Sequence, residues 1–183
     1  MSATIDRRTA RSRRRLHAAL VDEILERGWD RVSVRAVCAR AGVGRSTFYL
    51  HFADKEDALV GGLDHVRDEL RAAADPRAPF GFVRGMIEHA GASRRLFRAV
   101  IGKRSGLAVQ RRFREVVREL MLDGLRASRV PARALEARAR FLGGAFVEML
   151  IWWVDDPSGL GAEALAREFE QLAAPIVVGH TRG

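Results

Sequence analysis

Apolar residues recur at helical spacing along almost the whole sequence, and this pattern limits the chain to an all-α fold. Leu16, Leu20 and Ile24 recur every four residues, as on the buried face of one helix, and Gly28 then ends that helix. No segment alternates apolar and polar residues as a half-buried strand does. The periodicity and its breaks predict about nine helices, near residues 16–27, 33–40, 45–52, 54–74, 80–90, 93–101, 107–127, 131–154 and 161–174.

Positive charge is concentrated in the N-terminal quarter of the chain. The 183 residues carry a net charge of +9, which favours a polyanionic partner such as nucleic acid or an anionic membrane. Residues 1–52 hold eleven arginines against five acidic residues. The densest group is Arg7, Arg8, Arg11, Arg13, Arg14 and Arg15. This group is either a solvated tail or an arm that contacts DNA.

The single cysteine and the length of the apolar runs indicate the cellular compartment of the protein. Cys38 has no partner for an intramolecular disulfide, so nothing indicates an oxidising compartment. The longest strongly apolar run, residues 146–154, is too short to span a bilayer and contains Glu148. We therefore expect a soluble cytoplasmic protein without membrane contacts. Cys38 itself is interpreted as a small core residue, with a redox switch as the alternative.

A tight turn at residues 41–44 is followed by a short helix with two different faces. Phe48 and Phe52 lie on one side of this helix and are expected to pack inward. The outer face carries Arg45, Ser46, Thr47, Tyr49, Leu50 and His51. Two short helices joined by a turn that contains Gly form a helix-turn-helix, whose second helix enters the major groove of DNA. An ordinary pair of packed helices is the alternative.

Residues 24–59 resemble the DNA-binding region of the tetracycline-repressor-like (TetR) family. The matching positions are Gly28, Ser33–Val34, Ala41–Gly42–Val43, Thr47–Phe48–Tyr49, Phe52 and Lys55–Glu56. Gly44 departs from the family, which more often has a residue that can cap the recognition helix. The resemblance implies a homodimeric transcriptional regulator, usually a repressor, that binds double-stranded DNA at a palindromic operator. It also implies a helix-turn-helix domain at 1–55 and a helical ligand-binding and dimerisation domain at 56–183.

The resemblance also assigns roles to individual residues. Ser33, Tyr49 and Lys55 are expected to contact phosphate. The positions expected near base edges are Arg35, Arg45, Ser46, Thr47 and Leu50, with His51 close to the DNA backbone. A pocket for an unknown, largely apolar small-molecule effector is expected from Phe82, Met86, His89, Phe97, Phe113 and Met121. The same residue types also form plain helical cores, so the pocket is expected on family grounds only.

A heptad-like stripe in the 131–154 helix predicts a dimer seam. The stripe consists of Leu135, Ala139, Leu142, Phe146, Met149 and Trp153, at steps of four and three residues. Together with Leu165 and Phe169 of the last helix it is expected to form a two-fold four-helix interface. Packing of the stripe inside one chain is the alternative. Gly61 and Gly62 suggest either a soft point in the 54–74 helix or close packing against the first helix.

Two other classes of function were weighed against a ligand-responsive repressor. An architectural DNA-binding protein would bend DNA with apolar wedges, and no such wedge is evident. A helical-bundle enzyme would need a catalytic constellation, and none can be defended from the sequence. The five histidines have no metal-ligand spacing, so we expect no metal, no cofactor and no enzymatic activity.

Overall fold

The computed structural model describes residues 2–75, 78–101, 107–126, 131–155 and 159–178. Within these ranges the chain forms nine α-helices and one short 3-10 helix, and no strand. The predicted all-α fold with about nine helices is therefore confirmed. None of the helices in these ranges is both long enough and apolar enough to cross a membrane.

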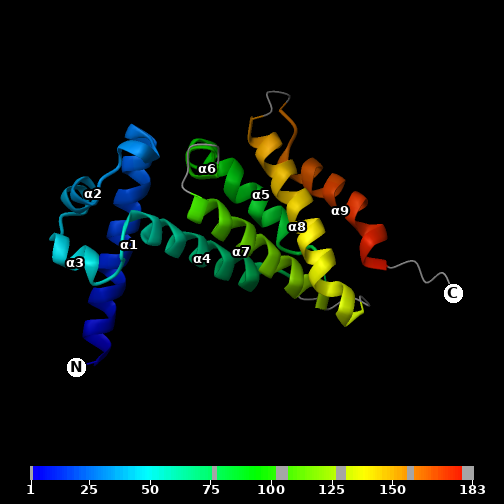
Figure 1. Ribbon diagram of the computed structural model, residues 1–183, viewed down its shortest axis with the longest axis horizontal. Coiled ribbons are helices and arrows are strands. Elements are labelled where there is room, and N and C mark those ends of the chain that lie inside the picture. The colour runs from blue at the N-terminus through cyan, green and yellow to red at the C-terminus, as the bar shows by residue number, and fades with distance from the viewer. Residues whose placement is uncertain (1, 76–77, 102–106, 127–130, 156–158, 179–183) are drawn as a thin grey trace.

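The first three α-helices form a compact group at one end of the molecule (Figure 1). They are α1 (Ser2–Arg27), α2 (Val34–Ala41) and α3 (Arg45–Tyr49), with the 3-10 helix η1 (Trp29–Arg31) between α1 and α2. Gly28 ends α1 as predicted, and Ser33 caps α2 by accepting a hydrogen bond from the backbone N–H of Ala36 at 3.2 Å. The N-terminal part of α1 begins at Ser2, well before the first apolar repeat that predicted it.

Helix α4 (Lys55–Ala73) leads from this group into the rest of the molecule (Figure 1). Asp54 caps it as predicted, because its carboxylate accepts from the N–H of Asp57 at 2.8 Å, while Asp57 accepts from Ala53 at 2.9 Å. The helix continues without a break through Gly61 and Gly62. The sequence predicted a domain boundary after residue 55, which is the first residue of α4. This boundary stays a prediction.

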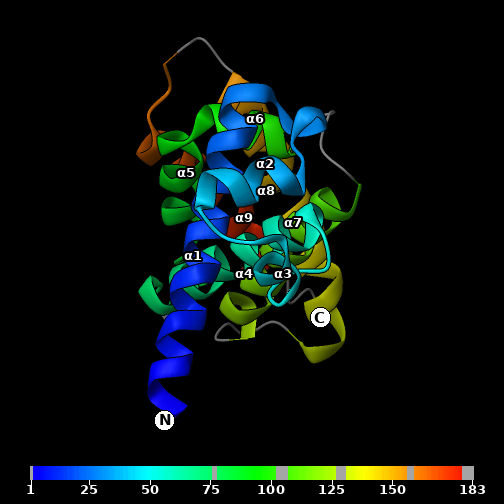
Figure 2. The ribbon, with the colours of Figure 1, turned by 90° about the vertical axis from the view of Figure 1, so that its left-hand side faces the viewer.

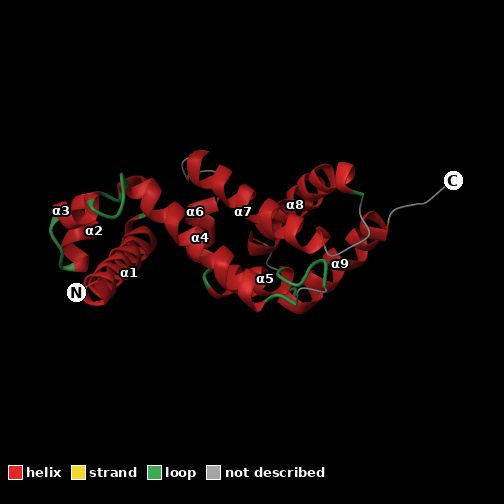
Figure 3. Cartoon of the chain, turned by 90° about the horizontal axis from the view of Figure 1, so that it is seen from below, coloured by secondary structure: helices red, strands yellow, loops and turns green. Residues whose placement is uncertain are grey.

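The remaining helices pack around a second part of the core. They are α5 (Val83–Ala92), α6 (Arg94–Ile101), α7 (Leu107–Arg126), α8 (Ala132–Asp155) and α9 (Ala162–Val178). Seen from below, the described parts of the chain appear as helices and connecting loops (Figure 3). Helix α9 runs past the predicted stop at residue 174 and includes Pro175. Phe146 of α8 sits at the centre of this core, 5.8 Å from the ring of Phe82 and 5.1 Å from that of Phe169.

The predicted dimer seam is wrong in its residues. Leu142, Phe146 and Trp153 of α8 are at most 3% exposed, and so are Leu165 and Phe169 of α9. Leu135 and Met149 are partly buried against the same core. The stripe packs inside one chain, because heptad-like spacing over a few turns is shared by any helix that turns one face to a core. The five side chains that are at most 3% exposed are therefore not available to a second chain.

Candidate DNA-binding interface and ligand cavity

The turn between α2 and α3 depends on Gly42. Its backbone adopts the left-handed conformation, with φ at 63°, which residues with a Cβ atom rarely adopt. Its N–H donates to the carbonyl of Ala39 at 3.2 Å, and the N–H of Val43 donates to Cys38 at 3.1 Å. These bonds satisfy the end of α2 and turn the chain sharply into α3. The tight turn predicted from the sequence is present, and it joins α2 and α3 as a helix-turn-helix.

Helix α3 has one buried face and one exposed face. Phe48 is fully buried and Phe52 is 4% exposed, with their ring centroids 5.6 Å apart. This aromatic pair fixes α3 to the first two helices. The face turned away from the core carries four of the predicted DNA contacts, namely Arg45, Ser46, Tyr49 and Leu50, while Thr47 is half-buried. Leu50 is 83% exposed and Tyr49 is 52% exposed, so this face is open to a large partner. Figure 2 shows α3 on the side of the molecule that faces the viewer.

Arg45 lies in the first turn of α3 and is paired with Tyr49, four residues on. Gly44 precedes it and supplies no side-chain cap, as the sequence indicated. A side-chain hydrogen bond to Tyr49 raises the pKa of Arg45. The guanidinium therefore stays charged and lies along the exposed face of α3. A guanidinium has five N–H donors, so Arg45 retains donors for the two acceptors that a guanine edge offers.

His51 is held by α1 rather than left free. Its Nε2 atom is 2.6 Å from the hydroxyl oxygen of Ser12. The Ser12 hydroxyl donates its single proton to the carbonyl of Thr9 at 2.9 Å, so His51 Nε2–H is the donor in the bond to Ser12. This leaves Nδ1 as the ring nitrogen that can face an external partner. Sequence patterns contain no signal for this bond, because Ser12 and His51 are far apart along the chain.

Lys55 is engaged inside the protein. Its ammonium group donates to the carbonyl oxygens of Trp29 at 3.0 Å and Val32 at 3.1 Å, and it lies 4.5 Å from the centre of the Trp29 ring. These contacts tie the start of α4 to η1, so two of the three ammonium protons are used. Ser33 is also used, as the cap of α2, although it remains exposed. Arg35 is exposed.

An ion-pair cluster that the sequence did not single out joins α1 to α2. Glu23 is only 2% exposed, and its carboxylate accepts from Arg40 Nε at 2.8 Å. Arg40 also donates to Glu26 at 2.8 Å, and this bond, followed by the one to Glu23, raises the pKa of Arg40. A buried carboxylate requires such a partner. The cluster fixes α2, and thereby the turn that places α3.

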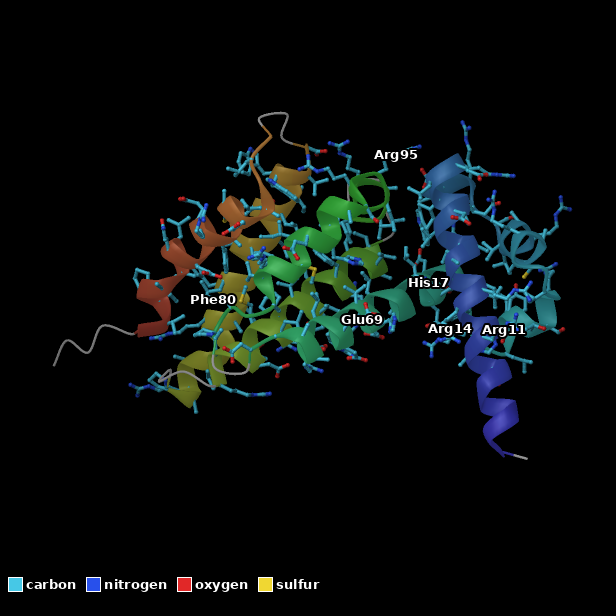
Figure 4. All side chains as sticks on the ribbon, turned by 180° about the vertical axis from the view of Figure 1, so that it is seen from behind. Arg11, Arg14, His17, Glu69, Phe80 and Arg95 are labelled. Carbon is cyan, nitrogen blue, oxygen red and sulfur yellow. The ribbon has the colours of Figure 1, made fainter. Side chains whose placement is uncertain are left out.

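The arginine-rich segment is helical where its backbone is described. Helix α1 continues past α3 toward the N-terminus (Figure 2), and Arg11 and Arg14 are exposed along it (Figure 4). Arg13 lies over the ring of Phe52 at 5.6 Å. The side chains of Arg7 and Arg8 lie outside the described part of the structure. An unstructured tail is therefore wrong for residues 9–15, whereas contact of this segment with DNA stays a prediction.

A mainly apolar cavity of about 270 Å³ lies between α1 and helices α4 to α7. Its lining includes four of the six predicted pocket residues, namely Met86, His89, Phe97 and Phe113. Phe82 and Met121 do not line it, because Phe82 packs on Phe146 and Met121 is fully buried in the core. The rest of the wall comes from α1, α4, α6 and α7, and includes His17, Val21, Leu63 and Val66. The sequence missed these residues because helical periodicity marks buried positions without indicating where packing leaves space.

Gly62 is explained by close packing against α1, one of the two alternatives left open by the sequence. A Cβ atom placed on Gly62 would lie 1.9 Å from Nε2 of His17. A Cβ atom on Gly61 would meet only the flexible end of Arg13 at 3.0 Å and the Phe52 ring at 3.6 Å. Gly62 is thus required by the approach of His17, whereas Gly61 is not.

Other candidate chemistry finds no support in the described residues. Within them, no group of three or more His, Cys, Asp or Glu side chains is placed to hold a metal ion, and His180 lies outside them. Cys38 is 4% exposed, and burial raises the pKa of its thiol. A buried thiol with a raised pKa is a poor nucleophile, which favours the interpretation of Cys38 as a core residue.

Comparison with known proteins agrees with this arrangement. Residues 16–60 match the family model for bacterial regulatory proteins of the tetR family, and residues 78–174 match that for a transcriptional regulator C-terminal region. No curated protein sequence matched the chain.

Several solved structures share the fold. A TetR transcriptional regulator from Streptococcus agalactiae 2603V superimposes with a TM-score of 0.70 at 20% identity, covering 94% of this chain and 99% of that one. A TetR-family regulator from Syntrophomonas wolfei gives 0.71 at 18% identity, with 93% and 97% covered. NalD, the secondary repressor of the MexAB-OprM multidrug efflux pump in Pseudomonas aeruginosa, gives 0.63 at 18% identity, with 91% and 96% covered.

These identities show a shared fold, while the two family models together account for both ends of the molecule. The turn at Gly42 and the exposed face of α3 lie within the N-terminal match. The chain therefore belongs to the tetR family of bacterial regulatory proteins and is a DNA-binding transcriptional regulator.

Proposed function

We propose that the protein is a ligand-responsive repressor that binds a palindromic operator as a homodimer. The observation that carries this proposal is the exposed face of α3, which is pinned from behind by Phe48 and presents Arg45, Ser46 and Tyr49 outward. A rigid helix with a polar and cationic outer face suits insertion into the major groove. Arg11, Arg14 and Arg15 on α1 add positive charge that favours the phosphate backbone.

A different face of α8 from the one expected supports dimerisation. Phe141 is 64% exposed and Trp152 is 55% exposed, and they lie on one ridge with Ala145 and Glu148 at steps of four, three and four residues. A Cβ atom on Gly144 beside this ridge would meet no other atom within 4 Å. An exposed ridge with two large aromatic side chains, next to a position without a side chain, lets a second helix approach closely. We propose that this ridge, with Leu172 of α9 (61% exposed), pairs with its copy across a two-fold axis.

The cavity is the basis for the proposed response to a ligand. It lies between α1 of the DNA-binding region and the helices behind it, so an occupant contacts elements of both regions. A ligand changes DNA affinity only if it binds one arrangement of these helices better than another. The walls of this cavity include both α4, which leads from the DNA-binding region, and α1 itself.

Selection from a pool of random DNA duplexes tests the proposal. The purified protein is expected to enrich a two-fold symmetric sequence whose half-site centres are about one helical turn apart, roughly 10 base pairs. A Tyr49→Ala, Ser46→Ala variant, altered only on the exposed face of α3, serves as the matched control and is expected to enrich that sequence poorly. Enrichment of no sequence, or of the same sequence by the control, would contradict the proposal.

A further inference from the structure

His17 of α1, which lies beside α4 (Figure 4), lines two hollows. One is the apolar cavity of about 270 Å³. The other is an open groove of about 550 Å³, whose lining includes Arg13, Arg14, Asp64 and His65. His17 and Gly62 line both hollows. The imidazole, seated on the backbone of α4 at Gly62, is therefore the wall between them.

The His17 ring has hydrogen-bonding capacity that the protein does not use. Among the described residues, no hydrogen bond or ion pair involves either ring nitrogen. Neutral imidazole carries one donor and one acceptor. A polar group inside the cavity can therefore pair with His17.

None of the described residues that line the cavity carries a full charge. Besides His17, its polar lining residues are His89 and Ser93, and the others are apolar. Burial lowers the pKa of His17, with smaller contributions in the same direction from His65 and Arg13, so the ring is neutral at pH 7. An ionised ligand would lose its hydration in such a site without gaining a counter-charge. The volume lies just below the range of about 300–1,000 Å³ that is usual for ligand sites, which favours a small molecule.

We propose that this cavity binds a small, neutral, mainly apolar molecule whose one hydrogen-bonding group meets the His17 imidazole, so that the ligand touches α1 of the DNA-binding region directly. The inference rests on the proposed ligand response and adds to it the class of ligand and the residue that senses it. Val21 lines the same wall one helical turn further along α1. A ligand in contact with His17 and Val21 therefore contacts α1, the helix that packs against α2 and is hydrogen-bonded to His51.

A matched pair of fluorescent probes tests the ligand class. N-phenyl-1-naphthylamine is neutral and carries one N–H group, and 1-anilinonaphthalene-8-sulfonate has the same ring system with a negative charge. The wild-type protein is expected to bind the neutral probe at least tenfold more tightly than the anionic one. Equal or tighter binding of the anionic probe would overturn the proposed class.

Variants of two histidines test the contact with α1. His17→Ala is expected to weaken the neutral probe about tenfold, the equivalent of one hydrogen bond of about 1.4 kcal/mol, whereas His17→Gln retains most of the affinity. His65→Ala is the control, because His65 lines the groove but not the cavity. Unchanged affinity in His17→Ala would overturn the contact.

A measurement on the wild-type protein avoids the question of whether a variant folds. In a ¹H–¹³C spectrum of the histidine rings, the neutral probe is expected to shift the His17 signal, while the signal of His65, which lines the groove but not the cavity, stays in place. Binding of the probe with no shift at His17 would overturn the inference. Both measurements are made without DNA, so the absence of an enriched palindrome would count against the proposed function alone.

Discussion

Arg45 and Lys55 were both expected to contact DNA, but the protein uses their side chains differently. Lys55 Nζ bonds two backbone carbonyls and lies on the Trp29 ring. Arg45 is hydrogen-bonded to Tyr49, which is itself on the exposed face of α3. Release of Arg45 therefore disturbs no contact between helices, whereas release of Lys55 would loosen α4 from η1. Of the two, Arg45 is the residue that can contact bases without loss of a contact between helices.

Replacement of Arg45 by Ala should reduce binding to the selected palindrome by about 1–3 kcal/mol and change binding to random duplex little, because a bidentate contact to guanine is specific to one base. Fluorescence anisotropy at fixed salt measures both affinities. Arg14→Ala is the control, since an exposed arginine on α1 can meet only phosphate and should weaken both duplexes about equally. Equal losses in Arg45→Ala would show that Arg45 does not read bases.

His17 should make the stability of the protein sensitive to mild acid. Its pKa is lowered in the folded state from an ordinary value of 6.5, so the unfolded chain binds the proton first as the pH falls. The free energy of unfolding should therefore decrease as the pH drops below about 6.5. Urea unfolding of wild type and His17→Gln between pH 7.5 and 5.5 measures this contribution. A pH profile identical in the two proteins would contradict it.

At the scale of helices, the sequence predicted those elements whose signals are local. Ser33 and Asp54 cap the helices that they were expected to cap, and Gly28 and Gly42 end the two helices before them. These positions are determined by hydrogen bonds over a few residues, which sequence spacing records directly. The α8 stripe was misassigned because its spacing is the same whether the facing helix belongs to the same chain or to another.

Contacts between helices that are distant in sequence could not be predicted from the spacing of apolar residues. The pairs Ser12–His51 and His17–Gly62 join residues about 40 positions apart. The sequence around each residue does not indicate which distant residue it contacts. Only the adjacent glycines Gly61 and Gly62 indicated one of these contacts, namely the close packing of α4 against α1. The pocket residues were predicted in part for the same reason, since Phe82 and Met121 share the helical faces of true lining residues but meet other side chains there.

The two glycines of α4 should respond oppositely to the same change. Gly61→Ala should be neutral or stabilising by up to about 1 kcal/mol, because Ala favours a helix interior and meets only side-chain ends. Gly62→Ala should lower the melting temperature, because its methyl group would occupy the place of the His17 ring. Adding His17→Ala to Gly62→Ala should recover part of the loss. Equal melting temperatures for the two single variants would refute the packing described here.

At the scale of the whole molecule, ion pairs bind α4 to α7. Arg67 lies 3.0 Å from Glu119 and Arg71 lies 2.6 Å from Asp123, while Arg112 of α7 reaches back to Asp64 of α4. Helix α7 in turn packs against α8, which carries the exposed ridge (Figure 1). The DNA-binding region is thus linked through α4 and α7 to the surface proposed for dimerisation.

That surface can be tested without altering the core. Phe141→Glu places a charge on the exposed ridge, and it should convert a dimer of twice 20.3 kDa into a monomer of 20.3 kDa by light scattering at micromolar concentration. Leu107→Glu is the control, because Leu107 is 78% exposed on α7 and lies off the ridge. A dimer that survives Phe141→Glu, or a wild-type monomer, would remove the ridge as the interface.

The central claim is that two α3 helices of one dimer read one face of the DNA together. Anisotropy titrations of the selected palindrome, and of the same palindrome with five base pairs inserted between its half-sites, test this claim most directly. The insertion rotates one half-site by about half a turn and moves it away from the second α3 helix. We predict that affinity for the lengthened duplex falls close to that for random DNA. Equal affinity for both duplexes would contradict the account.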